Sequence, residues 1–229
     1  MSSSFLDLTN KTLRRLNEVE ISQSDFGSVR GVQALAKDAV KAAIAKINQA
    51  EYEWPFNAAE HTQALVSGQE EYSWPTYFKI VDWNSFQLQK DSSLGVEYAH
   101  LDYMSRDDWY ENHRHEDYTA GSAGRSVPKE VFPGHGMGFG VTPTPDKAYT
   151  LKFRYYMNYA DLTNYDDLSR IPVAFEDVVI DGALYHMYML RNNLEAAQLT
   201  QGAFLQGVKE MQTLLINKFT SVNDTRVKY

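Results

Sequence analysis

The sequence has no cysteine among its 229 residues. Disulfides, thiol nucleophiles and cysteine-ligated metals are therefore excluded. The first twenty residues lack a basic segment followed by an apolar run, which is the pattern of a signal peptide. No apolar run approaches the length that spans a bilayer. We therefore expect a protein that folds in the cytoplasm and makes no membrane contact.

Positive charge is also scarce. The chain has 22 Lys and Arg residues against 30 Asp and Glu residues, a net charge of -8. A protein that binds nucleic acid by itself normally carries a cluster of basic residues, and this chain has none. We expect no tight or specific DNA binding, although DNA can still pass along the protein.

The motifs of common catalytic sites are missing. Residues 134–140 (GHGMGFG) and 121–124 (GSAG) are rich in glycine. Neither stretch ends in Gly-Lys-Ser/Thr or runs into a helix, as a phosphate-binding loop requires. No Gly-x-Ser-x-Gly elbow is present. The sequence predicts a protein that is not an enzyme and needs no cofactor.

Histidines and carboxylates cluster at residues 111–117 (ENHRHED). Two histidines and a carboxylate can hold iron or zinc. His113 and His115 share a face only on a strand, however, and this segment is too polar and turn-like for a rigid strand. We therefore expect a solvated loop and no metal.

A second acidic cluster lies at Glu176, Asp177 and Asp181. Paired carboxylates can perform acid–base catalysis. The first two also fall in the expected first turn of a helix, where the helix dipole favours negative charge. The structural interpretation is the stronger one.

Aromatic residues are abundant, with 15 Tyr, 11 Phe and 4 Trp. Tyrosine offers apolar area and a hydroxyl group together, which suits wet protein–protein contacts. Tyrosine also suits β-strands. The composition alone leaves both interpretations open.

Helical periodicity occurs at both ends of the chain. The first predicted helix starts after Ser4, with Asp7 completing a capping box, and extends to about residue 19. A second covers residues 29–54 and ends because Pro55 follows. Two more follow Pro172, over 172–193 and 194–219, the first of them apolar on most sides. Gly202 and Gly207 in the last helix indicate strong packing or a close neighbour.

Strand-like alternation fills the middle of the chain. We expect strands within residues 60–68, 78–89, 94–103 and 148–160, with short strands and turns in 121–146. Residues 105–118 are polar and predict a short helix or an ordered loop. Trp54-Pro55 closes a helix and Trp74-Pro75 opens a strand, so the two Trp-Pro pairs are punctuation and not a repeat.

The predicted fold class is α+β. Residues 1–56 and 172–220 form a four-helix bundle from both chain ends, and residues 57–171 form an inserted antiparallel β-domain. Residues 221–229 have no periodicity and predict a flexible C-terminal tail. Proline lies near both insertion points, as is typical of a domain boundary.

Four stretches together resemble a known family. They are AEYEWPF (50–56), SGQEEYSWPTYFKIVDWNSF (67–86), VTPTPDKAYTLKFRYY (141–156) and IPVAFEDVVIDGALYHMYMLRNNLEAAQLTQGAFLQGVKEM (171–211). In order and character they resemble the head-to-tail adaptor (connector) proteins of tailed bacteriophages, including the tail tubular protein A type. The resemblance covers nearly the whole chain, and residues 105–118 look like a local insertion.

The resemblance implies a structural protein of the virion neck. Such adaptors form a ring of about twelve copies beneath the portal protein, with helical bundles side by side around a DNA channel. The C-terminal segment reaches into the portal, and the β-domains face the next tail or nozzle protein. DNA passes through the lumen without specific binding.

The site residues expected on this basis lie in two places. The portal-binding residues are in the C-terminal tail, with three apolar anchors and two charge partners: Val222, Val227 and Tyr229, and Arg226 and Lys228. Trp109 and Tyr110 in the polar insertion are the expected tail-side contacts. Two alternatives remain: a tail terminator or other tail-side ring, and a glycan-binding or enzymatic virion component.

Overall fold

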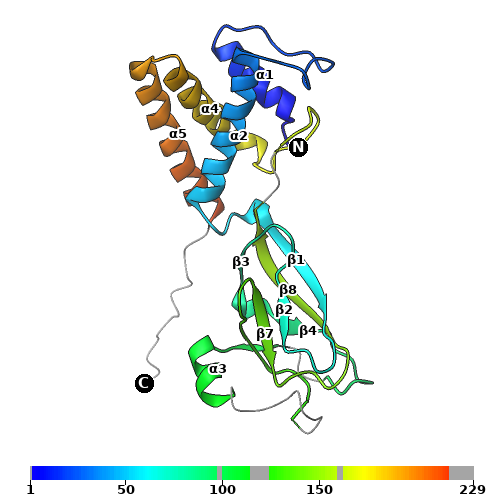
Figure 1. The fold of residues 1–229 in the computed structure, drawn as a ribbon. Helices are drawn as coiled ribbons and strands as arrows, with labels where there is room; N and C mark the ends of the chain where they lie inside the picture. Colours follow the sequence, from blue (N-terminus) through cyan, green and yellow to red (C-terminus); the bar gives the residue numbers. More distant parts are fainter. Residues whose placement is uncertain (1, 97–99, 114–123, 159–161, 217–229) are drawn as a thin grey trace, which may run out of the picture. The chain divides into compact units, whose positions relative to one another are not determined.

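The computed structural model describes residues 2–96, 100–113, 124–158 and 162–216 (Figure 1). The chain divides into two compact units. A helical unit comprises Met1–Asn57 with Tyr159–Tyr229, and a β-unit comprises Ala58–Asn158. The described residues contain five α-helices and two four-stranded sheets. The predicted α+β class is confirmed.

Helix α1 (Phe5–Arg15) begins as its sequence predicts. The Ser4 side chain accepts a hydrogen bond from the Asp7 backbone N–H, and the Asp7 carboxylate accepts one from the Ser4 backbone. This is the capping box, which satisfies two donors that the first turn leaves free. The helix ends before residue 19, because Asn17 adopts a left-handed conformation (φ 56°) and turns the chain. Val19 is therefore exposed.

Helix α2 (Val32–Ala50) ends before Trp54. The Trp54 indole is fully buried, and its Nε1 donates to the carbonyl oxygen of Ile47 at 2.8 Å. A short 3-10 helix, η1 (Pro55–Asn57), follows and leads out of the helical unit. Trp54 thus packs back on the helix that it follows, and Pro55 starts the exit.

The second half of the helical unit begins with the 3-10 helix η3 (Val173–Phe175), which runs into α4 (Glu176–Leu190). Helix α5 (Leu194–Leu215) is capped by the Asn193 side chain. Helix α4 packs against α1, α2 and α5, as its nearly all-round apolar surface predicts. Two helices from each end of the chain contribute to one buried cluster, including Phe5, Leu8, Val40, Ile47, Ile180, Met187, Phe204 and Met211.

Residues 162–171 also pack in the helical unit. The backbone N–H of Phe5 donates to the carbonyl oxygen of Asp167 at 2.8 Å, and Ile171 is buried in the helical core. The β-unit ends at Asn158, whereas the sequence-based expectation ended the inserted domain at residue 171. Hydrogen bonds to α1, which a local pattern cannot reveal, attach this segment to the helices.

Close packing explains one of the two glycines in α5. A Cβ on Gly207 would lie 2.7 Å from Cγ2 of Val178 in α4, while a Cβ on Gly202 would meet nothing within 4 Å. Gly182 in α4 is equally tight, because its Cβ would lie 2.8 Å from the Phe204 ring. The α4–α5 contact therefore requires glycine at positions 182 and 207.

The first sheet of the β-unit is built on β8 (Thr150–Met157). β1 (Ala58–Ala64) pairs with one side of β8, and β3 (Phe78–Val81) and β4 (Gln87–Leu88) pair with the other, all antiparallel. The 3-10 helix η2 (Trp83–Ser85) separates β3 from β4 within the range 78–89 where strands were expected. The predicted alternation of β8 is confirmed, with Leu151, Phe153 and Tyr155 buried.

The second sheet has the order β2 (Glu71–Ser73), β7 (Gly138–Thr142), β6 (Glu130–Pro133) and β5 (Asp102–Tyr103). The expected antiparallel pairing is confirmed for the first sheet, but the second sheet is mixed, because β5 and β6 are parallel. The segment between β5 and β6 includes helix α3 (Arg106–Asn112). A crossover connection that contains a helix lets the second strand run in the same direction as the first. Residues 94–103 were predicted as one strand. The described part of this range forms β5 and isolated bridges at Val96 and His100.

Aromatic rings fill the core between the strands. Trp74 stacks on Phe78 with ring centroids 4.3 Å apart, and Phe86 stacks on Phe153 at 4.6 Å. Trp74 follows β2 and precedes β3, so the second Trp-Pro pair lies between two strands. Much of the aromatic content therefore serves the core of the β-unit.

Candidate functional site

Helix α3 lies against the β6–β7 hairpin, within the stretch that resembles an insertion. Ser105 caps it, and Trp109 is only 9% exposed because its indole stacks on Phe132 of β6, with ring centroids 4.8 Å apart. Trp109 therefore holds α3 on the sheet, and its ring does not face solvent. The expectation that Trp109 is a tail-side contact placed its side chain at the surface. Local sequence could not show its burial, because its stacking partner Phe132 lies far along the chain.

Tyr110 begins a chain of three polar side chains. Its hydroxyl lies 2.8 Å from Nε2 of His135 in the β6–β7 loop. Nδ1 of the same histidine lies 2.6 Å from Oε1 of Glu71 in β2, and its backbone N–H donates to the same oxygen at 3.0 Å. Three segments of the β-unit are thus joined through one imidazole, a link that sequence spacing does not indicate.

Arg106 adds a second attachment of α3. Its guanidinium donates to the carbonyl oxygens of Pro133 (3.0 Å) and Gly134 (2.5 Å), and it lies 5.4 Å from the centre of the Tyr110 ring. Interactions of this kind fix both the position and the rotation of a short helix. The exposed face of α3 is therefore a firmly held surface.

The pKa values of two adjacent carboxylates in this region, Glu70 and Glu71, are shifted in opposite directions. Burial and the neighbouring Glu71 raise the pKa of Glu70, against the opposing effect of the Trp109 indole. For Glu71, burial acts in the same direction, but the hydrogen bonds from His135 outweigh it and lower the pKa. The outer face of α3 adds Asp107, Asp108 and Glu111, so this surface is acidic.

Of residues 111–117, the structure describes Glu111, Asn112 and His113. Nε2 of His113 lies 3.9 Å from Oε2 of Glu130. Arg114, His115, Glu116 and Asp117 lie outside the described residues. Within the described ranges, no group of three or more His, Asp or Glu side chains is arranged to hold a metal ion.

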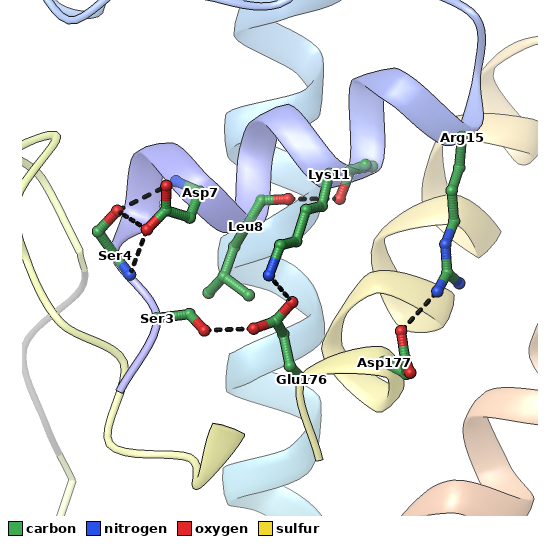
Figure 2. Close-up of polar contacts among 9 residues, drawn as sticks. Ser3, Ser4, Asp7, Leu8, Lys11, Arg15, Glu176 and Asp177 are labelled. Carbon is green, nitrogen blue, oxygen red and sulfur yellow. Dashed lines mark hydrogen bonds and ion pairs between the residues drawn. The ribbon is translucent and has the colours of Figure 1, made fainter. Parts of the chain in front are cut away.

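The acidic cluster of α4 joins the two chain ends (Figure 2). Glu176 accepts hydrogen bonds from the Lys11 ammonium and the Ser3 hydroxyl. Arg15 in α1 bonds to Asp177 at 2.5 Å and to Asp181 at 2.9 Å. These carboxylates are engaged by basic residues of α1, which favours the structural interpretation over acid–base catalysis.

The helical unit exposes large apolar side chains. Four leucines of α5 are between 58% and 72% exposed: Leu194, Leu199, Leu205 and Leu214. They lie off the buried stripe of this helix, which consists of Ala197, Phe204, Val208 and Met211. Exposed apolar area of this extent marks interaction surfaces in soluble proteins.

A groove lies between α2 and α4. It has a volume of about 270 Å³ and is lined mainly by apolar side chains, including Leu35, Met189 and Leu190, with Asp38 and His186 beside them. Burial and the charge of Lys46 lower the pKa of His186, so its neutral form is favoured. The groove and the α5 leucines are features of the helical unit that sequence reasoning missed.

The expected portal-binding residues lie outside the described residues. They are Val222, Arg226, Val227, Lys228 and Tyr229, all beyond the last described position, Ile216. Among the described helices, none combines the length and hydropathy needed to cross a membrane.

Comparison with known proteins addresses the identity of the chain. A search of curated proteins finds no match. The family model of the SU10 adaptor protein matches residues 3–226, which is nearly the whole chain and includes both units. The resemblance to phage head-to-tail adaptors is thereby confirmed, and the chain belongs to the SU10 adaptor protein family, whose members are structural components of the phage virion.

Proposed function

We propose that this protein joins the portal to the tail as a ring of about twelve copies whose lumen forms part of the DNA channel. Family membership supports the adaptor role. The observation that carries the ring is the apolar surface of the helical unit. Four exposed leucines on one helix are costly in a monomer and are expected where copies pack together.

The ring contact is assigned to the helical unit. Its four helices act as a four-helix bundle, and bundles of neighbouring copies pack side by side. In a cyclic ring each copy presents two different patches to its two neighbours. The leucines of α5 supply one patch, and the α2–α4 groove supplies the other.

The portal contact is assigned to residues 221–229. Three apolar residues act as anchors, Val222, Val227 and Tyr229, and Arg226 and Lys228 act as charge partners. A short segment that orders only on binding suits such an arm. The acidic chain, with a net charge of -8, suits a lumen that does not hold DNA, because phosphate is repelled.

The tail-side contact is assigned to α3 of the β-unit. Trp109 supports this contact by packing α3 against Phe132 of β6, and Tyr110 positions the same helix through its contact with His135. Changing both to Ala is expected to impair attachment of the next tail component while portal docking is retained. Intact tail attachment by the double variant would contradict this assignment.

The first test uses the purified protein and its portal ring. The mass of the mixture is measured by sedimentation, and its symmetry is imaged by electron microscopy. We expect a ring of added mass on the portal for the full chain and no added mass after deletion of residues 221–229. The matched control is Tyr103→Ser, an exposed change in the β-unit that leaves the C-terminal residues intact and is expected to dock normally.

Each other result has a definite meaning. A deletion variant that docks normally refutes the C-terminal assignment. If the full chain binds the tail tube and not the portal, the adaptor proposal is rejected in favour of a tail-side ring protein. A glycan or metal bound by the purified protein would favour a different kind of virion component.

A further inference from the structure

Gly202 is a glycine of α5 that the fold of one copy does not explain. It is exposed, and a Cβ at this position would meet nothing within 4 Å. Glycine is the least favourable residue of a helix interior apart from proline. Gly207 is required by its contact with Val178 of α4, whereas no described neighbour requires Gly202. Glycine also lets a second backbone approach closely, so Gly202 marks a place where another molecule can pack against α5.

The side of α5 around Gly202 is suited to such a contact. Four exposed residues follow the three-or-four-residue spacing of one helical face, and we call them the Gly202 face: Leu199, Gly202, Gln206 and Glu210. Leu205, which is 58% exposed, lies beside this face. A position without a side chain thus lies between two exposed leucines. This leaves room for a helix, and apolar area remains to be buried by it.

The groove between α2 and α4 has a matching shape. On α2 it is lined by Leu35, Asp38 and two small residues, Ala39 and Ala42. Small side chains allow a second helix to approach closely, as Gly202 does on its own side. None of the described residues that line the groove belongs to α5, so the groove and the Gly202 face are separate surfaces of one copy.

Contacts within the helical unit relate the positions of α2 and α5. A Cβ on Gly182 of α4 would lie 2.8 Å from the ring of Phe204 in α5 and 2.9 Å from Cβ of Ala43 in α2, so Phe204 and Ala43 lie at one level of the bundle. Eight residues after Phe204, the side chain of Gln212 donates to the carbonyl oxygen of Ala50, seven residues after Ala43. The two helices therefore run in the same direction, as Figure 1 also shows.

We infer that α5 of one copy packs in the α2–α4 groove of the next copy, with Gly202 at the closest approach to α2. The inference rests on the proposed ring and identifies the contact that closes it. Gly202 lies two residues before Phe204, which places it at the level of residues 41–42, beside the groove alanines. Rotation about a ring axis leaves the height of each residue unchanged. Surfaces at one level therefore meet without an offset when bundles stand side by side.

The charges of the two helices also favour a second copy as the occupant. α2 carries three lysines and one aspartate, whereas α5 carries two glutamates and one lysine. Lys46 follows Ala42 by about one turn, and its level differs from that of Glu210 by less than one turn. Glu210 accepts a hydrogen bond from Gln206, but neither Lys46 nor Glu210 has an ion-pair partner among the described residues of one copy. We expect Lys46 and Glu210 to pair across the contact.

Binding of the full-length protein to its portal ring, measured by sedimentation over a range of protein concentrations, tests the contact. A contact between copies makes binding cooperative, because each bound copy favours the binding of its neighbour. Gly202→Gln places a side chain in the contact. It is expected to weaken the cooperative step by about tenfold or more and to leave the affinity of a single copy for the portal unchanged.

The matched control is Gly27→Gln. Gly27 is exposed, and its Cβ would also meet nothing within 4 Å, but it lies in the loop before α2 and outside both surfaces. This variant is expected to bind as cooperatively as wild type. Urea denaturation of the free variants reports on folding, and Gly202→Gln is not expected to destabilise the free protein, because glutamine favours a helix over glycine.

A charge exchange provides a second measurement. Lys46→Glu and Glu210→Lys each replace an attraction by a repulsion and are each expected to weaken the cooperative step by about threefold or more. The double variant restores opposite charges and is expected to recover most of the loss, which a double-mutant cycle measures. A double variant that recovers nothing would contradict the relative position assigned to the two helices.

The outcomes separate the inference from the proposed function. Loss of cooperativity in Gly202→Gln, with cooperativity retained in Gly27→Gln, supports the inference. Wild-type cooperativity in Gly202→Gln overturns it and leaves the adaptor proposal intact. Weaker binding of single copies with unchanged cooperativity also overturns it, because the Gly202 face then contacts the portal. If the wild-type chain forms no ring on the portal, the proposed function fails, and the inference fails with it.

Discussion

Glu176 is the residue at which the two ends of the chain meet. Its side chain is 13% exposed and accepts hydrogen bonds from Lys11 and Ser3, both near the N-terminus. It also stands in the first turn of α4, where negative charge is favoured. One carboxylate thus couples the start of α4 to α1, although the sequence separates these helices by the whole β-unit.

Replacing Glu176 by Gln is expected to destabilise the helical unit by about 1 to 3 kcal/mol at pH 7, because charged hydrogen bonds at a largely buried site are lost. The free energy of unfolding is measured by urea denaturation. The control is Glu20→Gln, since the Glu20–Arg14 pair is 48% and 64% exposed and is worth little. Equal effects of the two substitutions would contradict this role of Glu176.

The same residue predicts a pH dependence. Burial alone would raise the pKa of Glu176, but the bonds from Lys11 and Ser3 outweigh it and lower the pKa below the ordinary 4.5. A carboxylate with a lowered pKa stabilises the folded state above its unfolded pKa, and this stabilisation is lost as the pH falls through the folded value. The difference between wild type and Glu176→Gln is therefore expected to shrink below pH 4.5. An unchanged difference at pH 3 would contradict it.

At the scale of elements, α4 and α5 show which features of a helix pair can be predicted from the sequence. The period of α5 predicts a helix, and its core residues Phe204, Val208 and Met211 follow the three-or-four-residue spacing of one helical face. Whether Gly202 or Gly207 permits a close contact depends on where α4 crosses, which no local pattern contains. The burial of Trp109 could not be predicted from local sequence either, because the parallel pairing of β5 with β6 brings its partner Phe132 to it.

The two glycines of α5 are expected to respond in opposite ways to alanine. Gly202→Ala is expected to stabilise the protein by up to about 1 kcal/mol, because its Cβ meets open space and alanine favours the helix. Gly207→Ala is expected to destabilise it, since the Cβ lies 2.7 Å from Val178. Chemical denaturation of the free protein measures both. Stabilisation by Gly207→Ala would show that α4 and α5 pack less closely than described.

Helix α3 depends on one buried ring. Trp109→Ala is expected to cost the β-unit about 3 to 5 kcal/mol, because it removes the stack on Phe132 and leaves a cavity. Tyr110→Phe removes only the hydroxyl contact to His135 and is expected to cost about 1 kcal/mol. Urea denaturation followed by fluorescence of the remaining tryptophans compares them. A smaller cost for Trp109→Ala than for Tyr110→Phe would contradict the anchoring role.

For the whole molecule, the two units have separate cores. The helical core draws residues from both ends of the chain, from Phe5 to Met211, while the core of the β-unit lies entirely between Ala59 and Met157. Locally alternating strands made the presence of a β-domain predictable. Its limits were less predictable, because residues 162–171 are held by hydrogen bonds to the N-terminal segment.

The β-unit is formed by one uninterrupted stretch of the chain. A fragment of residues 58–158 is expected to fold alone, since the core residues that the structure describes for this unit all lie within it. Two-dimensional amide NMR spectra are expected to show dispersed signals, and circular dichroism a cooperative thermal transition. The fragment 1–57 is the matched control: it lacks α4 and α5, which supply eight of the 21 buried residues of the helical core, and is expected not to fold. If the β fragment is unfolded while the whole protein is stable, the units depend on each other, and the proposed tail-side and portal-side contacts cannot be altered independently.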